Sequence, residues 1–137
     1  MSRSIKFTND TYLDSSGVTF EKTPFNKILT YSTEEVIIGK WIDGKFIYRK
    51  VINNLCGNLY GLLNNLNIDF LIDVKGNAWS NYNHKMPINT PNPEPPNYVF
   101  GVYQTASNRN IEVFYNSKYF ADQNKVICIV EYTKTVD

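Results

Sequence analysis

The sequence predicts an all-β fold, an antiparallel β-sandwich of the jelly-roll kind, and three observations support this fold class. Aromatic residues make up 15% of the 137 residues, with ten Tyr and eight Phe, and such residues favour strands. Short apolar stretches of alternating character are separated by turns rich in Asn, Asp, Ser and Gly. No stretch shows the alternation of strands and helices that builds a parallel sheet, and the length fits one domain.

Residues 31–51 form two alternating apolar runs joined by Asp43-Gly44, which is a strong hairpin signal. A two-residue type I′ turn at this dipeptide would place Trp41 opposite Phe46 and Gly39 opposite Tyr48. One face of the hairpin is then aromatic and the other is mixed, which indicates a hairpin covered on both sides by a second sheet or by another subunit. The residues assigned to this structural hairpin are Trp41, Asp43, Gly44, Phe46 and Tyr48.

The segments on either side of the hairpin carry weaker signals. Residues 1–30 alternate poorly and bury little apolar surface alone, so they either rely on other subunits or a larger assembly for order or form an ordinary first hairpin. Residues 51–67 hint at helical spacing, but Gly57 and Gly61 argue against a stable helix, and we predict a strand end followed by a loop or a single turn.

Four further strands are predicted, at residues 68–74, 98–105, 111–115 and 125–133. The last of these is apolar on both faces, which predicts a central place in a sheet. Strand 68–74 alternates, with Ile68, Phe70, Ile72 and Val74 on one face and Asp69, Leu71 and Asp73 on the other.

Charge and cysteine content exclude several classes of protein. The net charge is +1 and the basic residues are scattered, so nucleic acid is not expected as a partner. No run approaches the roughly 18 apolar residues of a membrane span, and no signal peptide is visible, so we expect a soluble protein made in the cytosol. Cys56 and Cys128 lie in apolar contexts, which favours buried free thiols, although a disulfide is the alternative.

Catalytic, metal and cofactor sites are not expected. His84 is the only histidine, and no zinc, phosphate-loop or nucleophile-elbow motif is present. The carboxylate pairs Glu34/Glu35 and Asp69/Asp73 are the candidates for acid and base chemistry. Glu34 and Glu35 would point to opposite faces of a strand, and a solvent-facing pair is the simpler interpretation of Asp69 and Asp73.

Residues 75–97 contain five of the six prolines and predict a long loop, a kind of segment that often carries function. Rings beside amide and cationic donors are the contacts that saccharides need, although the same residues could instead pack between subunits. The predicted ligand-binding residues are Trp79, Tyr82, Asn83, His84, Lys85, Tyr98, Asn108 and Arg109. A wider set adds Asn77, Asn81, Tyr103 and Asn110.

The segments Tyr31-Ser-Thr-Glu-Glu, Gly39-Lys-Trp-Ile-Asp-Gly-Lys45 and Tyr48-Arg-Lys resemble the head region of tail-fibre, baseplate and small structural proteins from bacteriophages of Gram-positive bacteria and from phage-tail-like bacteriocins. The similarity extends to residues 4–7 and 11–17 at the N-terminal end, and to residues 67–76 and 131–137. It thins out between residues 77 and 125.

The resemblance implies a homotrimeric virion protein near the phage tail tip, assembled in the bacterial cytoplasm, whose distal loops bind a host cell-wall glycan without catalysis. It also implies that residues 1–30 are an N-terminal attachment or trimerisation segment and that residues 31–137 are the β-sandwich head domain. Its implied partners are two further copies of itself, other tail or baseplate proteins and that glycan, with neither nucleic acid nor membrane insertion. Two alternatives stay open. One is a purely structural virion component, such as a head fibre, tail-tip or decoration protein; the other is a glycan depolymerase with carboxylates gathered at a subunit interface.

Overall fold

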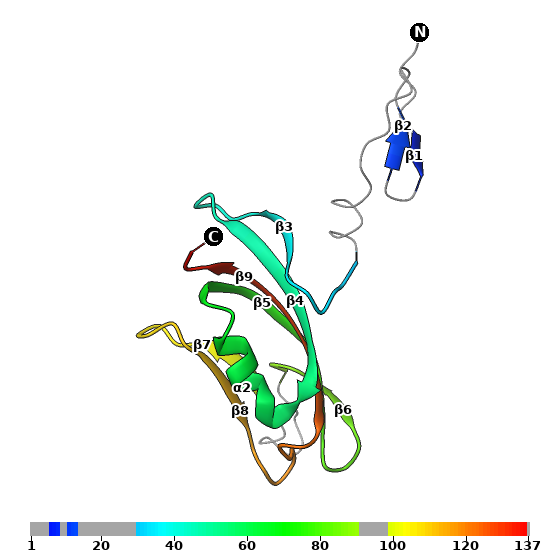
Figure 1. Ribbon diagram of the computed structural model, residues 1–137. Coiled ribbons are helices and arrows are strands. Elements are labelled where there is room, and N and C mark those ends of the chain that lie inside the picture. The colour runs from blue at the N-terminus through cyan, green and yellow to red at the C-terminus, as the bar shows by residue number, and fades with distance from the viewer. Residues whose placement is uncertain (1–5, 9–10, 14–29, 91–98, 137) are drawn as a thin grey trace.

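The computed structural model describes residues 6–8, 11–13, 30–90 and 99–136 of the chain (Figure 1). These residues are mostly β, in antiparallel sheets, with one short helix. This confirms the predicted all-β, antiparallel class. The sandwich of two sheets and the trimer stay predictions.

Five strands form the main sheet, and the last strand of the chain lies at its centre. Their order is β3 (Val36–Lys40), β4 (Phe46–Leu55), β9 (Lys125–Lys134), β5 (Ile68–Trp79) and β6 (Lys85–Pro87). The central position of β9 confirms the prediction made from its two apolar faces. Alternate residues of β9 are fully buried on one face of the sheet, namely Val126, Cys128, Val130 and Tyr132.

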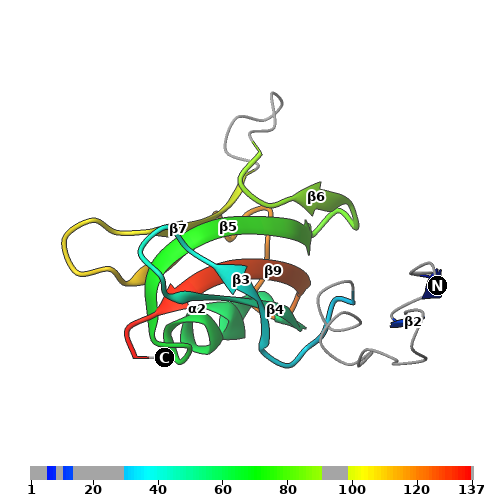
Figure 2. The same cartoon turned by 90° about the horizontal axis from the view of Figure 1, so that it is seen from above.

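A helix and a two-stranded ribbon cover this face and enclose the core. The helix α2 spans Cys56–Asn64, and the ribbon consists of β7 (Phe100–Gln104) and β8 (Ile111–Tyr115). In Figure 2 the strands of the main sheet curve around the helix. The largest fully buried side chains of this second layer are Leu59, Leu63, Phe100, Ile111 and Phe120.

The helix corrects the prediction of a loop or single turn after residue 55. Its buried face is made by Cys56, Leu59 and Leu63, so packing against the sheet outweighs the low helix propensity of glycine. Gly57 does not break the helix but lets it approach Asp122 closely, because a Cβ at this position would lie 2.8 Å from the Cβ of Asp122. Its N-H also donates to the carbonyl of Asp122 at 2.8 Å.

The hairpin at Asp43-Gly44 is present, but its turn and its register differ from the prediction. The N-H of Trp41 donates to the carbonyl of Lys45 at 2.8 Å, and the N-H of Gly44 donates to the carbonyl of Trp41 at 2.9 Å, which encloses a three-residue loop. Within the turn Gly44 has a positive φ, +88°, and Asp43 does not; Oδ1 of Asp43 accepts the N-H of Lys45 at 2.9 Å. The observed pairs are Lys40 with Phe46, Gly39 with Ile47, Ile37 with Tyr48 and Val36 with Arg49.

The prediction of one aromatic hairpin face is therefore wrong. Phe46 lies opposite Lys40, whose ammonium is 5.5 Å from the centre of the ring. Trp41 leaves the pairing and stacks on Phe70 with ring centres 5.5 Å apart. Tyr48 stacks on Tyr132, the residue that lies opposite it in β9. The three rings thus contact three different partners.

Two bulges in β5 overturn the predicted faces of residues 68–74. The register with β9 shifts between Ile68 and Phe70 and again between Leu71 and Asp73. Phe70 is consequently 48% exposed, whereas Leu71 packs against the core. The side chain of Asp69 is only 16% exposed and ion-paired, so its description as one of a solvent-facing pair is also wrong.

The predicted long loop at 75–97 is largely a hairpin. β5 continues to Trp79 and pairs with β6, placing Trp79 opposite Lys85. Residues 91–98, Tyr98 included, lie outside the described residues. In the N-terminal segment, β1 (Lys6–Thr8) and β2 (Thr11–Leu13) pair with each other, and the role of residues 1–30 in attachment stays a prediction.

Both cysteines are free and buried, which confirms the preferred of the two alternatives. Burial, with a smaller contribution from Asp122, raises the pKa of Cys56 to about 11, and burial raises that of Cys128 to about 12.

Side-chain amides hold the β7-β8 ribbon to the rest of the fold. They form the pairs of backbone hydrogen bonds that a neighbouring strand would otherwise provide. Asn64 at the end of α2 accepts the N-H of Ile111 at 3.0 Å and donates to its carbonyl at 2.8 Å. Asn89 does the same for Val102, at 2.7 and 2.8 Å. Gln104 accepts the N-H of Leu71 at 3.0 Å and donates to the carbonyl of the bulged Asp69 at 2.8 Å.

Asn64→Ala should lower the free energy of unfolding by about 2–3 kcal/mol, because it leaves the N-H and C=O of buried Ile111 without partners. Asn65→Ala is the matched control: its side chain is exposed and forms no hydrogen bond within the described residues, so a change within about 0.5 kcal/mol is expected. Urea unfolding followed by circular dichroism measures both. Equal effects of the two substitutions would contradict the role assigned to Asn64.

Candidate functional site

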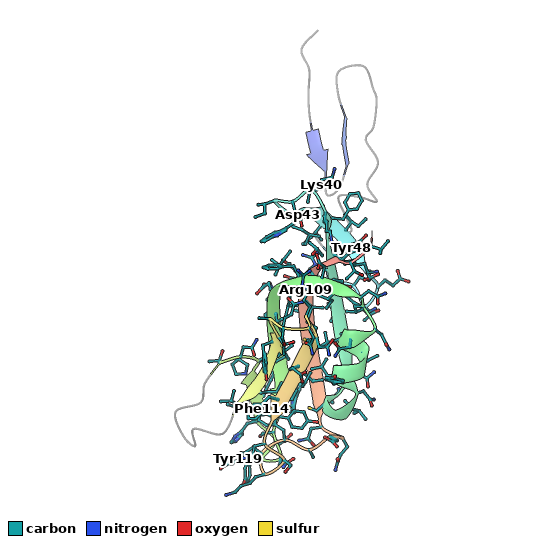
Figure 3. The ribbon with its side chains drawn as sticks, turned by 90° about the vertical axis from the view of Figure 1, so that its left-hand side faces the viewer. Lys40, Asp43, Tyr48, Arg109, Phe114 and Tyr119 are labelled. Carbon is teal, nitrogen blue, oxygen red and sulfur yellow. The ribbon has the colours of Figure 1, made fainter. Side chains whose placement is uncertain are left out.

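A cavity of about 420 Å³ opens where three separate parts of the chain meet. They are the tip of the β3-β4 hairpin, the start of β5 and the loop between β7 and β8. Figure 3 shows Asp43 and Arg109 toward the hairpin end of the molecule, far from Phe114 and Tyr119 at the other end. The lining residues are Trp41, Asp43, Asp69, Phe70, Gln104, Thr105, Ala106 and Arg109.

Two aromatic rings form one wall of this cavity. The rings of Trp41 and Phe70 are stacked, with an interplanar angle of 27° and a centre-to-centre distance of 5.5 Å. The three-residue turn frees Trp41 from strand pairing, and the bulge in β5 turns Phe70 outward, where it is 48% exposed. The turn and the bulge together present aromatic surface to solvent.

Asp69 is the ionic centre of the cavity. Its Oδ2 accepts from the Lys45 ammonium at 2.9 Å, and its Oδ1 accepts from the Arg109 guanidinium. The hydrogen bond from Lys45 is the largest influence on its pKa; burial opposes it, and the charges of Arg109 and Lys45 reinforce it, so the pKa lies below its ordinary value. Both oxygens are thus engaged and the group is held ionised, which suits binding better than proton donation.

The loop that carries Arg109 is held in one conformation by its own hydrogen bonds. Arg109 has a φ of +59°, an uncommon conformation for a residue other than glycine, and its N-H donates to the carbonyl of Thr105 at 3.0 Å. Thr105 N-H donates to the carbonyl of Asn110 at 2.9 Å, and Asn108 accepts both the Asn110 N-H and the Thr105 hydroxyl. Gln104 closes the loop by donating to the carbonyl of Arg109 at 3.1 Å.

The charges around the cavity balance. Asp43 and Asp69 carry two negative charges, and Lys45 and Arg109 carry two positive ones. A strongly charged ligand would gain little from such a set, whereas a neutral ligand rich in hydroxyl groups finds carboxylate acceptors and a guanidinium donor within reach. The side chain of Arg109 is 65% exposed and available from solvent.

Comparison with protein-family models, with curated proteins and with solved structures gives no match.

No helix in the described ranges, 30–90 and 99–136 among them, is long and apolar enough to cross a membrane. Among these residues there is also no group of three His, Cys, Asp or Glu side chains placed to hold a metal ion.

The structure divides the predicted ligand-binding residues between two ends of the molecule. Arg109 lines the cavity and Asn108 lies in the same loop. Trp79 lies opposite Lys85 next to the β5-β6 turn, and this turn is at the opposite end of β5 from Asp69. Tyr82, Asn83 and His84 lie in the turn between those two strands. Tyr98 lies outside the described residues.

Hydrogen bonds tie the β5-β6 turn to a neighbouring turn. Ser80 Oγ accepts the N-H groups of Tyr82 at 3.2 Å and His84 at 3.1 Å. Asn81 N-H donates to the carbonyl of Tyr119 at 2.6 Å, and the rings of Tyr82 and Tyr119 lie 6.3 Å apart. Asn83 has a φ of +63°, as turns require. The described residues of this turn do not line the cavity at Arg109.

The cavity also contains residues outside the predicted ligand-binding set. The sequence assigns Trp41 and Asp43 to the structural hairpin and predicts Asp69 and Phe70 on opposite faces of a regular strand, and all four line the cavity. The alternating pattern of residues 68–74 gives no sign of the bulges that bring these two residues together. A usable signal was the excess of polar residues at 104–110, a segment that already contained Arg109.

The carboxyl of Asp69 should titrate below its ordinary pKa of 3.8 in a pH series of carbon-detected NMR spectra. Because the folded-state pKa is depressed, the stabilisation from Asp69 is complete above the ordinary value and is lost as the pH falls through the folded value. Lys45→Met should raise the midpoint, since it removes the largest lowering contribution, and Arg109→Ala should raise it less. A midpoint at or above 3.8 in the native chain would contradict the ion-paired arrangement.

Proposed function

We propose that the protein is a non-enzymatic phage virion protein, from a tail fibre or baseplate, that binds host cell-surface saccharide for adsorption. Its binding site is the cavity bounded by Trp41, Phe70 and Arg109. One observation carries the proposal: a stacked aromatic pair lies beside an anchored guanidinium and two carboxylates in a single cavity.

Each group of the cavity matches one part of a sugar. The apolar C-H face of a pyranose ring packs on aromatic surface, which Trp41 and Phe70 provide. Its hydroxyl groups donate to Asp43 and accept from Arg109. Because the loop and the ion pair fix Arg109 before a ligand arrives, binding loses little conformational freedom there.

The virion context is supported by the same hairpin. The segment Gly39-Lys-Trp-Ile-Asp-Gly-Lys45, which resembles the phage tail proteins, supplies Trp41 and Asp43 to the cavity and Lys45 to Asp69. A resemblance carried by cavity residues bears more directly on function than one carried by core residues.

A homotrimer is part of the proposal, with the sandwich completed by packing of subunits. Large apolar side chains of the hairpin are exposed in the single chain: Ile37 by 46%, Ile42 by 91% and Phe46 by 37%. Surface of this kind marks interaction sites. Three copies would bury it and would multiply a modest affinity per site by avidity.

A purely structural virion component without receptor binding is the second candidate. It is favoured by the exposed aromatic residues on the outer face of the ribbon, Tyr103 at 53% and Phe114 at 58%, which a neighbouring particle protein would cover. In that case the cavity at Arg109 would have no ligand.

Trp41→Ala and Arg109→Ala should each weaken binding to Gram-positive wall polysaccharide by about tenfold or more, through loss of stacking and of hydrogen bonds respectively. Tyr82→Ala is the matched control, an exposed aromatic at the other end of β5, and should bind as the native chain does. Isothermal titration with purified polysaccharide measures the affinities, and thermal unfolding checks that each variant is folded. A loss confined to Tyr82→Ala would move the site to the β5-β6 turn. Absence of binding by the native chain would favour the structural candidate.

Light scattering should give a particle of three times the 15.8 kDa chain mass. Ile42→Glu should shift this particle toward the monomer, because it places a charge on an apolar residue that is 91% exposed in the single chain. Glu34→Gln, on an exposed polar residue, is the control and should leave the mass unchanged. A monomer at every protein concentration would exclude the trimer.

A further inference from the structure

A second cavity of about 290 Å³ adjoins the first on the other side of Arg109. The two cavities share Asp69 and Arg109, so the ion pair between these residues separates them and belongs to both. Both volumes are near or above the lower limit, about 300 Å³, of small-molecule sites. The second cavity is lined by Leu63, Asn64, Asn67, Ile68, Asp69, Asn108, Arg109, Asn110, Ile111 and Thr135.

The second cavity differs in chemistry from the first. It contains no aromatic ring; its polar lining consists mainly of amides and one hydroxyl, over an apolar base of three aliphatic residues. Asn64 and Asn108 are already engaged with the backbone. The side chains of Asn110 and Thr135 are exposed and form no hydrogen bond within the described residues, so both can serve a ligand.

Arg109 is placed to serve ligands on both sides. One of its nitrogens, Nη1, donates to Asp69, and a guanidinium carries five N-H donors in a fixed plane. The remaining donors can therefore reach hydroxyl groups in either cavity. The closed hydrogen bonds of its loop fix the backbone of Arg109, and the ion pair with Asp69 keeps its side chain at this boundary.

From this geometry we propose that the site is a continuous groove for a saccharide chain of at least two sugar units. The first unit stacks on Trp41 and Phe70, Arg109 bonds to hydroxyl groups on both sides of the linkage, and the next unit lies in the amide-lined cavity beside Asn110 and Thr135. The inference rests on the proposed function. It adds that the second unit is recognised by hydrogen bonds rather than by stacking, and that a single sugar fills only half of the site.

A glycan array that carries each sugar both as monomer and as tetramer tests this proposal. The native chain should bind at least one tetramer about tenfold or more tightly than its monomer, or bind the tetramer alone. Thr135→Trp fills the second cavity and should remove this advantage while leaving monomer binding unchanged. Val136→Trp is the matched control, because it is the next residue, is 81% exposed and does not line the cavity. Trp41→Ala should weaken both ligands.

The outcomes separate the groove from the proposed function. Equal affinity for monomer and tetramer, or a tetramer advantage that survives Thr135→Trp, overturns the groove and leaves saccharide binding at the first cavity in place. Loss of the advantage in Val136→Trp as well would mean that the effect does not come from the second cavity, and it also overturns the groove. Binding of no glycan by the native chain overturns both.

Discussion

The arrangement of this protein depends on side-chain amides that act as backbone partners. A two-stranded ribbon is marginal by itself, and β7 and β8 gain no third strand among the described residues. Side-chain amides take the place of a third strand. Asn64 bonds to the backbone of β8, Asn89 bonds to the backbone of β7, and Gln104 of β7 bonds to the backbone of β5. Each bond satisfies a main-chain group that would otherwise be buried without a partner. The ribbon can therefore close the core over α2 and β9.

The same constraint builds the cavity. Gln104 bonds on one side to the bulged backbone of β5 at Asp69 and Leu71, and on the other to the carbonyl of Arg109. One amide thus fixes the distance between the bulge and the β7-β8 loop, and the ion pair between Asp69 and Arg109 forms across that gap. The fold already holds the polar groups of the cavity, so the saccharide we propose would bind without rearrangement of these groups.

Features set by local composition could be predicted from the sequence, and features set by register could not. The apolar character of both faces of residues 126–130 places β9 at the centre, and the apolar context of the two cysteines predicts free buried thiols. Helical spacing in residues 51–67 was a signal for helix α2, but the long-range packing of Gly57 on Asp122, which makes a glycine useful there, could not be predicted. The bulges in β5 were equally hidden, since an extra residue leaves no mark in an alternating pattern. The role of Asn64 could not be predicted either. Abundant asparagine predicts turns, and it does not predict that one amide will bond to both the N-H and the carbonyl of Ile111.

The type of turn at Asp43-Gly44 determines whether Trp41 and Lys45 reach the cavity. With a two-residue turn, Trp41 would lie opposite Phe46 within the strand pairing, and the hairpin would offer only packing surface. The additional loop residue shifts the register by one, and in a strand a shift of one residue moves a side chain to the other face. Trp41 then reaches Phe70, and Lys45 reaches Asp69 from the same turn. The three-residue turn therefore brings Trp41 to Phe70 and Lys45 to Asp69 at the same cavity.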